Sequence, residues 1–219
     1  MALPFKEARA ALKDGPMATL KHVTPRYIVD RLSVVLDEKR NPNHPWLTKE
    51  SVELLAQLLR KQDVGVEFGS GRSTRWFLSK IAKITSIETH EGWYKKVSQD
   101  CESEIASQRM VYHLASDVES FEKIIDGFDS DSIDFCLVDG SHRDTCALSM
   151  VPKIKTGGLM VVDNINWYIP CENSTSPNAR RATDGYATEK WEEFAQLTKD
   201  WRYIWTSNGV SDTGIWFRT

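Results

Sequence analysis

Short apolar runs recur along the chain from about residue 64 onward, and stretches with helical spacing of apolar positions lie between them. Several runs are almost continuously apolar, as expected of strands that are covered on both faces. Alternation of such strands with helices is typical of parallel βαβ units. The predicted strands are 64–68, 84–88, 110–114, 133–139 and 159–163.

Capping signals place helices between these strands. Ser73 or Thr74 is expected to cap a helix after the first strand, and residues 116–119 have the spacing of a capping box. The glycine pair at 157–158 is expected to end a helical stretch before the fifth strand.

The C-terminal part of the chain has a different pattern, with a predicted helix at 187–199 and two further strands at 201–206 and 213–218. Asn208 and Gly209 between these strands favour an antiparallel hairpin, with a turn of two residues or a longer one. The predicted fold is therefore α/β, a Rossmann-like, mostly parallel seven-stranded sheet with helices on both faces and a C-terminal antiparallel hairpin.

The first part of the chain lies outside this repeat. Helical spacing occurs at 27–36 and 48–60, separated by a Pro- and Asn-containing segment. A length of 219 residues suits one α/β domain with a short appended element. We predict an N-terminal helical extension, 1–62, that packs on the core as a lid, and a ligand-binding domain, 63–219. The extension also offers a surface for a homodimer.

Composition and charge narrow the class of protein. With 41% hydrophobic and 27% charged residues, the chain has the composition of a globular protein, without a run long enough to cross a bilayer. The net charge of −3 lacks the broad positive field that nucleic-acid binding uses. Four scattered cysteines and an N-terminus without a signal-peptide pattern fit a reducing compartment. We therefore expect a cytoplasmic protein that binds neither nucleic acid nor membranes.

Residues 64–74 carry the most informative motif, a strand followed by a glycine turn and the start of a helix. Gly69 and Gly71 let the backbone turn sharply and approach a ligand at the carboxyl edge of the sheet. A dinucleotide motif would have a third glycine in place of Thr74 and would set Glu67 beside a pyrophosphate. An acid here suits a ligand with ammonium and sulfonium groups, and S-adenosylmethionine has both.

The motif resembles that of class I S-adenosylmethionine-dependent methyltransferases, in which an acid-x-Gly-x-Gly turn follows the first strand, and the resemblance extends to the C-terminus. It implies that Glu88 binds the ribose hydroxyls and that Asp117 lies beside the adenine amino group. Trp93 is a candidate for stacking on the adenine. A solvated strand end and a helix-dipole partner are the structural alternatives for Glu88 and Asp117. The predicted cofactor-binding residues are Glu67, Gly69, Ser70, Gly71, Ser73, Thr74, Glu88, Trp93, Asp117 and Asp139.

Polar side chains also follow the fourth and fifth strands, namely Asp139 and the pair Asp163 and Asn164. Because parallel strands end at one edge of the sheet, these oxygens are placed to converge on one hard cation. The arrangement resembles the divalent-metal-dependent O-methyltransferases that act on catechols and caffeoyl thioesters. The resemblance implies that Asp139, Asp163 and Asn164 bind Mg²⁺ or another divalent cation.

His142 stands where that family has a lysine as the base. An imidazole accepts a proton at physiological pH, so we expect Asp139 and His142 to activate the methyl acceptor. Residues 139–142 also resemble the Asp-Gly-x-His turn of another methyltransferase group, for which no metal is assumed. Metal-independent N-methylation with His142 as the base is therefore the alternative.

The long irregular stretch 168–184 is predicted to be a substrate lid, because loops of this length in compact domains are usually functional covers or disordered. Arg180 and Arg181 are candidates for binding a substrate carboxylate, and Trp167 for lining the mouth of the substrate site. The sequence thus predicts methylation of a small molecule, by O-methylation with a divalent cation. An NAD-linked oxidoreductase is disfavoured by Glu67 and Thr74, and a non-catalytic binding module by the clustered carboxylates.

Overall fold

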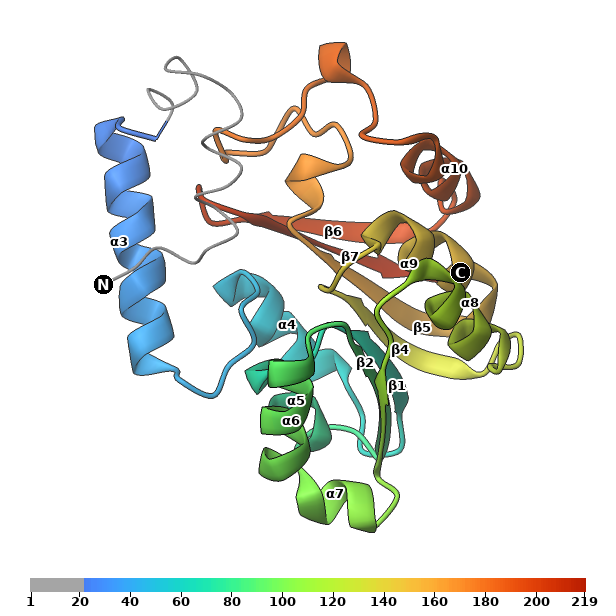
Figure 1. The fold of residues 1–219 in the computed structure, drawn as a ribbon. Helices are drawn as coiled ribbons and strands as arrows, with labels where there is room; N and C mark the ends of the chain where they lie inside the picture. Colours follow the sequence, from blue (N-terminus) through green and yellow to red (C-terminus); the bar gives the residue numbers. More distant parts are fainter. Residues whose placement is uncertain (1–21) are drawn as a thin grey trace.

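The computed structural model describes residues 22–219, and these residues form one seven-stranded sheet at the centre of the molecule (Figure 1). The strand order is β3-β2-β1-β4-β5-β7-β6. β7 is antiparallel to both of its neighbours, and the other pairs are parallel. The strands are β1 (Val64–Phe68), β2 (Lys83–Glu88), β3 (Met110–Leu114), β4 (Ile133–Val138), β5 (Ile154–Asp163), β6 (Arg202–Ser207) and β7 (Asp212–Phe217). The predicted sheet and its terminal hairpin are confirmed.

Helices cover both faces of the sheet (Figure 1). α4, α5 and α6 pack on one face, where Leu55 and Phe77 meet the inward side chain of Phe135. α8, α9 and α10 pack on the other face, where Phe121 and Trp191 are buried. The helices are α3 (Pro25–Arg40), α4 (Lys49–Leu58), α5 (Arg72–Leu78), α6 (Glu91–Asp100), α7 (Glu102–Ala106), α8 (Val118–Asp126), α9 (Arg143–Met150) and α10 (Glu189–Leu197), with short 3-10 turns η1 (Val151–Lys153), η2 (Ile165–Trp167) and η3 (Ala182–Asp184).

Two local predictions were wrong about where elements begin. β5 starts at Ile154, so the glycine pair lies inside the strand, where Gly157 has a φ of +80° and the β4–β5 register shifts. The pair therefore permits an irregularity of the strand instead of ending a helix. The helix after β3 is capped by Asp117, whose carboxylate accepts a hydrogen bond from the backbone N–H of Ser120. The N-cap is therefore Asp117, one residue after the first residue of the predicted capping box.

The described part of the predicted N-terminal extension, residues 22–62, contains two helices with different surroundings, and residues 1–21 lie outside the described residues. α4 buries Val52 and Leu55 against the sheet, whereas none of the side chains of α3 is buried. The N-terminal end of α3 lies near residues 175–177 and Gly209, across a cavity of about 360 Å³. The roles of the extension as a lid and as a dimer surface stay predictions. Within residues 22–219, no helix combines the length and apolarity needed to cross a bilayer.

Candidate active site

The glycine turn after β1 packs tightly against the loop after β4. Gly69 has a φ of +92°, a left-handed conformation that favours glycine. A Cβ added to Gly69 would lie 2.8 Å from the Cα of Gly140, and a Cβ on Gly140 would lie 2.9 Å from the nitrogen of Gly69. A Cβ on Gly71 would meet no described atom within 4 Å beyond its chain neighbours. The turn therefore leaves room for a ligand at Gly71, which fits the predicted cosubstrate.

Glu67 lies beneath this turn and not at its surface. Its side chain is 0% exposed and accepts hydrogen bonds from the hydroxyls of Ser73 at 2.6 Å, Thr74 at 2.6 Å and Ser86 at 2.9 Å. Burial raises the pKa of Glu67 to about 7, although the three hydroxyls oppose the shift. The N-cap of α5 is Gly71, and Thr74 at the third helical position accepts a hydrogen bond from the N–H of Gly71, so Thr74 takes part in capping the helix without being its N-cap residue. Glu67 therefore stabilises the glycine turn through the hydrogen bonds that it accepts beneath the turn.

Glu88, at the end of β2, joins the glycine turn to the start of α6. Its Oε2 accepts hydrogen bonds from the N–H of Ser70 at 3.0 Å and the hydroxyl of Ser70 at 2.9 Å. Its Oε1 accepts from the N–H groups of Thr89 and His90, both at 2.8 Å. The Ser70 hydroxyl also lies within hydrogen-bond distance of the Tyr112 hydroxyl. Binding of the ribose hydroxyls by Glu88 stays a prediction.

The other two predicted adenosine contacts lie at the surface. The backbone N–H and hydroxyl of Ser120 hydrogen-bond to Asp117 and lower its pKa. Trp93 is 38% exposed, and the Nζ of Lys96 lies 4.8 Å from the centre of its ring. Both residues follow strands at the carboxyl edge, and their contacts with adenine stay predictions.

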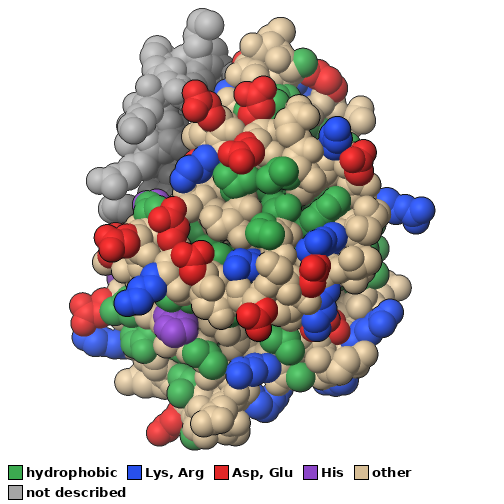
Figure 2. All heavy atoms as spheres, turned by 90° about the vertical axis from the view of Figure 1, so that its right-hand side faces the viewer, with side chains coloured by type: hydrophobic (Ala, Val, Ile, Leu, Met, Phe, Trp, Pro, Cys, Tyr) green, Lys and Arg blue, Asp and Glu red, His purple; other side chains and the backbone are tan. Residues whose placement is uncertain are grey.

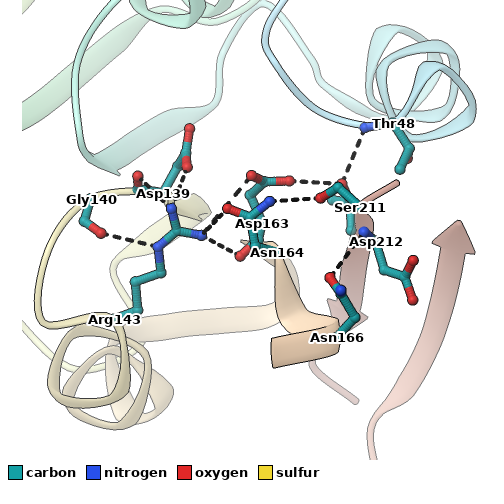
Figure 3. A network of polar contacts seen from close by, with 10 residues as sticks. Thr48, Asp139, Gly140, Arg143, Asp163, Asn164, Asn166, Ser211 and Asp212 are labelled. Carbon is teal, nitrogen blue, oxygen red and sulfur yellow. Dashed lines mark hydrogen bonds and ion pairs between the residues drawn. The ribbon is translucent and has the colours of Figure 1, made fainter. Parts of the chain in front are cut away.

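The carboxyl ends of β4 and β5 are joined by Arg143, the first residue of α9 (Figure 3). Its Nε donates to the carbonyl of Gly140 at 3.0 Å, and its Nη2 donates to the carbonyl and Oδ1 of Asp139 at 3.0 and 2.8 Å. Its Nη1 donates to the carbonyl of Asp163 and to Oδ1 of Asn164. A guanidinium has five N–H donors, so these bonds use all of them.

Two of the residues that contact Arg143, Asp163 and Asn164, are also held by residues in β7 and just before it. Oδ1 of Asp163 accepts a hydrogen bond from the hydroxyl of Thr213 at 3.1 Å, and that hydroxyl accepts one from the N–H of Thr48 at 3.2 Å (Figure 3). The amide of Asn164 donates to the hydroxyl of Ser211 at 2.6 Å. Asn164 has a φ of +52°, a conformation in which asparagine is favoured over most residues. The orientation of both side chains is therefore fixed from two directions.

The charges at this junction are mutually dependent. Burial would lower the pKa of Arg143, but the negative charges of Asp139 and Asp163 outweigh it and raise that pKa. Burial raises the pKa of Asp163, and the charge of Asp139 adds to this shift while Arg143 opposes it. Arg143 thus remains a cation between two carboxylates.

The structure brings Asp139, Asp163 and Asn164 together as predicted, and it places the guanidinium of Arg143 among their oxygens. The guanidinium of Arg143 already contacts oxygens from all of these residues, and its side chain is 9% exposed. A divalent cation in the same place would have to displace a buried positive charge and five hydrogen bonds. Within residues 22–219, no three His, Cys, Asp or Glu side chains are grouped to hold a metal ion. The residues do not fit a divalent cation.

His142 begins α9 with a φ of +52°. Its exposed ring packs edge-on against Phe121 of α8, with the ring centres 5.7 Å apart. Asp139 forms an ion pair with Arg143 at 2.8 Å. The role of His142 as a base stays a prediction, and its ring lies on the side of α8.

The segment predicted as a lid, 168–184, is drawn in orange in Figure 1 and runs above the β6–β7 hairpin, where the hydroxyl of Ser176 donates to the carbonyl of Val210. The guanidinium of Arg180 donates to the carbonyls of Asp184 at 2.6 Å and Gly185 at 2.7 Å. That of Arg181 donates to the carbonyls of residues 171, 172 and 174. Both arginines hold the segment in shape, and their role in binding a substrate carboxylate stays a prediction. Trp167 is half-buried in η2 and remains a candidate for lining the substrate site.

Sequence reasoning missed Arg143, which directly follows the predicted base. Its only local signal is its position four residues after Asp139, across the short turn that joins β4 to α9. The contributions of Thr213 and Ser211 come from β7 and the hairpin turn, and no local pattern indicates them.

Comparisons with known proteins agree with this fold. Residues 66–165 match the model of a family described as a methyltransferase domain. A provisionally assigned caffeoyl-CoA O-methyltransferase from Staphylococcus aureus has a similar structure, with a TM-score of 0.55, 15% identity, and coverage of 90% of this chain and 93% of that one. For a methyltransferase from Geobacter sulfurreducens these values are 0.52, 14%, 92% and 94%. For an rRNA methylase from Streptococcus thermophilus they are 0.51, 12%, 77% and 94%. No curated protein sequence matches the chain.

The sheet order, the terminal hairpin and the glycine turn define the Rossmann-like fold of class I methyltransferases, which the solved structures share. Together with this fold, the match of residues 66–165 to a methyltransferase-domain model supports a class I S-adenosylmethionine-dependent methyltransferase.

Proposed function

We propose that the protein transfers the methyl group of S-adenosylmethionine to a hydroxyl group of a small molecule, without a divalent cation. We expect no divalent cation because the guanidinium of Arg143 lies among the oxygens that would bind the metal, and all five of its N–H donors are hydrogen-bonded there. We also expect a small acceptor, because the predicted lid, 168–184, is held in one shape by its own arginines.

The glycine turn and Glu88 would hold the cosubstrate, whose sulfonium supplies an activated methyl carbon. Glu88 would bind the ribose hydroxyls once Ser70 turns to Tyr112. The acceptor oxygen forms a bond to the methyl carbon as the carbon–sulfur bond breaks, and the sulfur keeps the electron pair. The acceptor proton passes to His142, whose exposed ring is open to solvent for later release of that proton.

The charge of the surface also favours a small acceptor over a nucleic acid. Figure 2 shows one face of the molecule, on which acidic and basic side chains are interspersed. Nucleic-acid binding draws on a continuous positive surface, and the chain has 28 Lys and Arg residues against 31 Asp and Glu.

The proposal is tested by a methyl-transfer screen over phenols, catechols, amines and carboxylates, each with magnesium or with a chelator. We expect a phenol or catechol to be methylated at the same rate in both conditions. His142→Ala should lower kcat about a hundredfold with little change in KM, the size typical of losing a general base. His44→Ala is the control. Activity that requires magnesium, or activity on amines alone, would contradict the proposal.

A further inference from the structure

The position of Arg143 has a consequence for cation binding that is independent of methyl transfer. The five hydrogen-bond acceptors of its guanidinium are all oxygens, and they come from the ends of two adjacent strands (Figure 3). Three are backbone carbonyls, one is a carboxylate oxygen of Asp139 and one is the amide oxygen of Asn164. The second carboxylate, Oδ2 of Asp163, lies 4.0 Å from Nη1.

Carbonyl, amide and carboxylate oxygens are the ligands that hard divalent cations use in proteins. We propose that Arg143 is a built-in cation that occupies a latent divalent-cation site, and that removal of its guanidinium opens this site. Without Arg143, two carboxylates at the junction lose their shared positive charge, and an added cation would be drawn to them.

The ligands should keep their places when Arg143 is removed, because other groups also orient them. Thr213 holds Asp163, and Ser211 holds Asn164, through hydrogen bonds of 3.1 and 2.6 Å that do not involve Arg143. Asp139 follows β4 directly, and its N–H donates to the carbonyl of Phe68 at 2.9 Å. Such bonds to the ligands orient the site before a metal binds.

Calcium is the best probe among the common divalent cations. The oxygens surround a space the size of a guanidinium, which is wider than the shell at 2.0–2.1 Å that magnesium demands. Calcium accepts six to eight oxygens in flexible geometry, so water can complete its shell. We therefore expect Arg143→Ala to bind calcium more tightly than magnesium.

The test is calcium titration by calorimetry on the wild-type protein and on variants of Arg143, Asp163 and Arg218, each checked by circular dichroism. Arg143→Ala should bind one calcium ion with a Kd of about 10⁻⁴ to 10⁻³ M, as weak calcium modules do. Its Tm should fall below that of the wild type and rise with added calcium. The wild type and Arg143→Lys, which keeps a positive charge, should show no such binding. Arg143→Ala combined with Asp163→Asn should bind at least about tenfold more weakly than Arg143→Ala, because one ligand charge is lost.

Arg218→Ala is the matched control. Arg218 also pairs with a carboxylate, Asp131, at 2.7 Å, and donates to backbone carbonyls, but at a different part of the sheet. It should lose stability without gaining calcium binding. Calcium binding by the wild type that Asp163→Asn abolishes would overturn the proposal, and so would a folded Arg143→Ala protein that binds no calcium. An Arg143→Ala protein that stays unfolded in calcium also contradicts it, because the ion should replace the missing charge. None of these measurements depends on methyl transfer, so they remain decisive if the proposed acceptor is wrong.

Discussion

Replacement of Glu67 by glutamine should stabilise the protein at neutral and alkaline pH. Glu67 is fully buried, and its pKa is raised from 4.5 to about 7 because burial disfavours the charged form. Glutamine has nearly the same shape and cannot ionise. The hydroxyls of Ser73, Thr74 and Ser86 can rotate to donate to its oxygen or accept from its amide. Glu67→Gln should therefore remove the cost of burying a charge and keep the packing.

The size and direction of the effect follow from the pKa shift. A rise from 4.5 to about 7 corresponds to about 3 kcal/mol, at ~1.4 kcal/mol per pKa unit. The folded protein binds the proton of Glu67 more tightly than the unfolded chain does. The free energy of unfolding therefore loses this contribution as the pH rises from 4.5 through about 7, and the loss is complete above that range. The variant has no such contribution to lose.

Urea unfolding between pH 4.5 and 8.5, followed by tryptophan fluorescence, measures this difference. The free energy of unfolding of Glu67→Gln minus that of the wild type should grow by about 3 kcal/mol across the range. Glu53→Gln controls for the change in net charge, since the side chain of Glu53 is 61% exposed. Profiles of wild type and Glu67→Gln that run parallel within about 0.5 kcal/mol would refute the reasoning, because Glu67 would then titrate alike in both states.

Three further outcomes are expected. Gly140→Ala should lower the free energy of unfolding by about 1–3 kcal/mol, because the added Cβ would lie 2.9 Å from the nitrogen of Gly69; an unchanged urea midpoint would contradict this. Glu88→Gln should weaken binding of S-adenosylhomocysteine about tenfold or more in calorimetry, the loss of one charge-assisted hydrogen bond, whereas Ser70→Ala should change it less than about threefold. Equal losses of affinity in both variants would mean that the Ser70 hydroxyl also contacts the cosubstrate. Arg181→Ala should speed proteolytic cleavage within residues 168–184 and leave KM unchanged for a phenolic acceptor that carries a carboxylate; a large rise in that KM would support the predicted role of Arg181 in binding the carboxylate.

The arrangement of strands was predictable because it depends on local pattern. Alternation of apolar runs with helical spacing predicts parallel strands, and the Asn-Gly pair at 208–209 predicts the hairpin. The start of β5 was not predictable in the same way. A glycine pair is found both at helix ends and inside irregular strands, and the β4–β5 pairing that decides between them involves residues about twenty positions away.

Placement within the site was partly predictable, because parallel strands bring their carboxyl ends to one edge. Glu88, Asp139 and Asp163 all lie at that edge, as the sequence predicts. Their partners could not be predicted, since a carboxylate after a strand can bind a ligand, a metal or a neighbouring backbone group. For Glu88 the partners are backbone N–H groups and Ser70, and for Asp139 the partner is Arg143.

The arginines show the physical reason why the partners of these side chains could not be predicted. Arg180 and Arg181 looked available because they lie in a polar loop, yet a loop that closes on itself leaves carbonyls that need donors, and a guanidinium supplies five. Arg143 is satisfied in the same way, mainly by carbonyls, but its acceptors include two side chains that the sequence assigns to a metal. An arginine a few residues after an acidic strand end can therefore compete for that acid, and a metal site predicted from carboxylates alone should first be checked for such a neighbour.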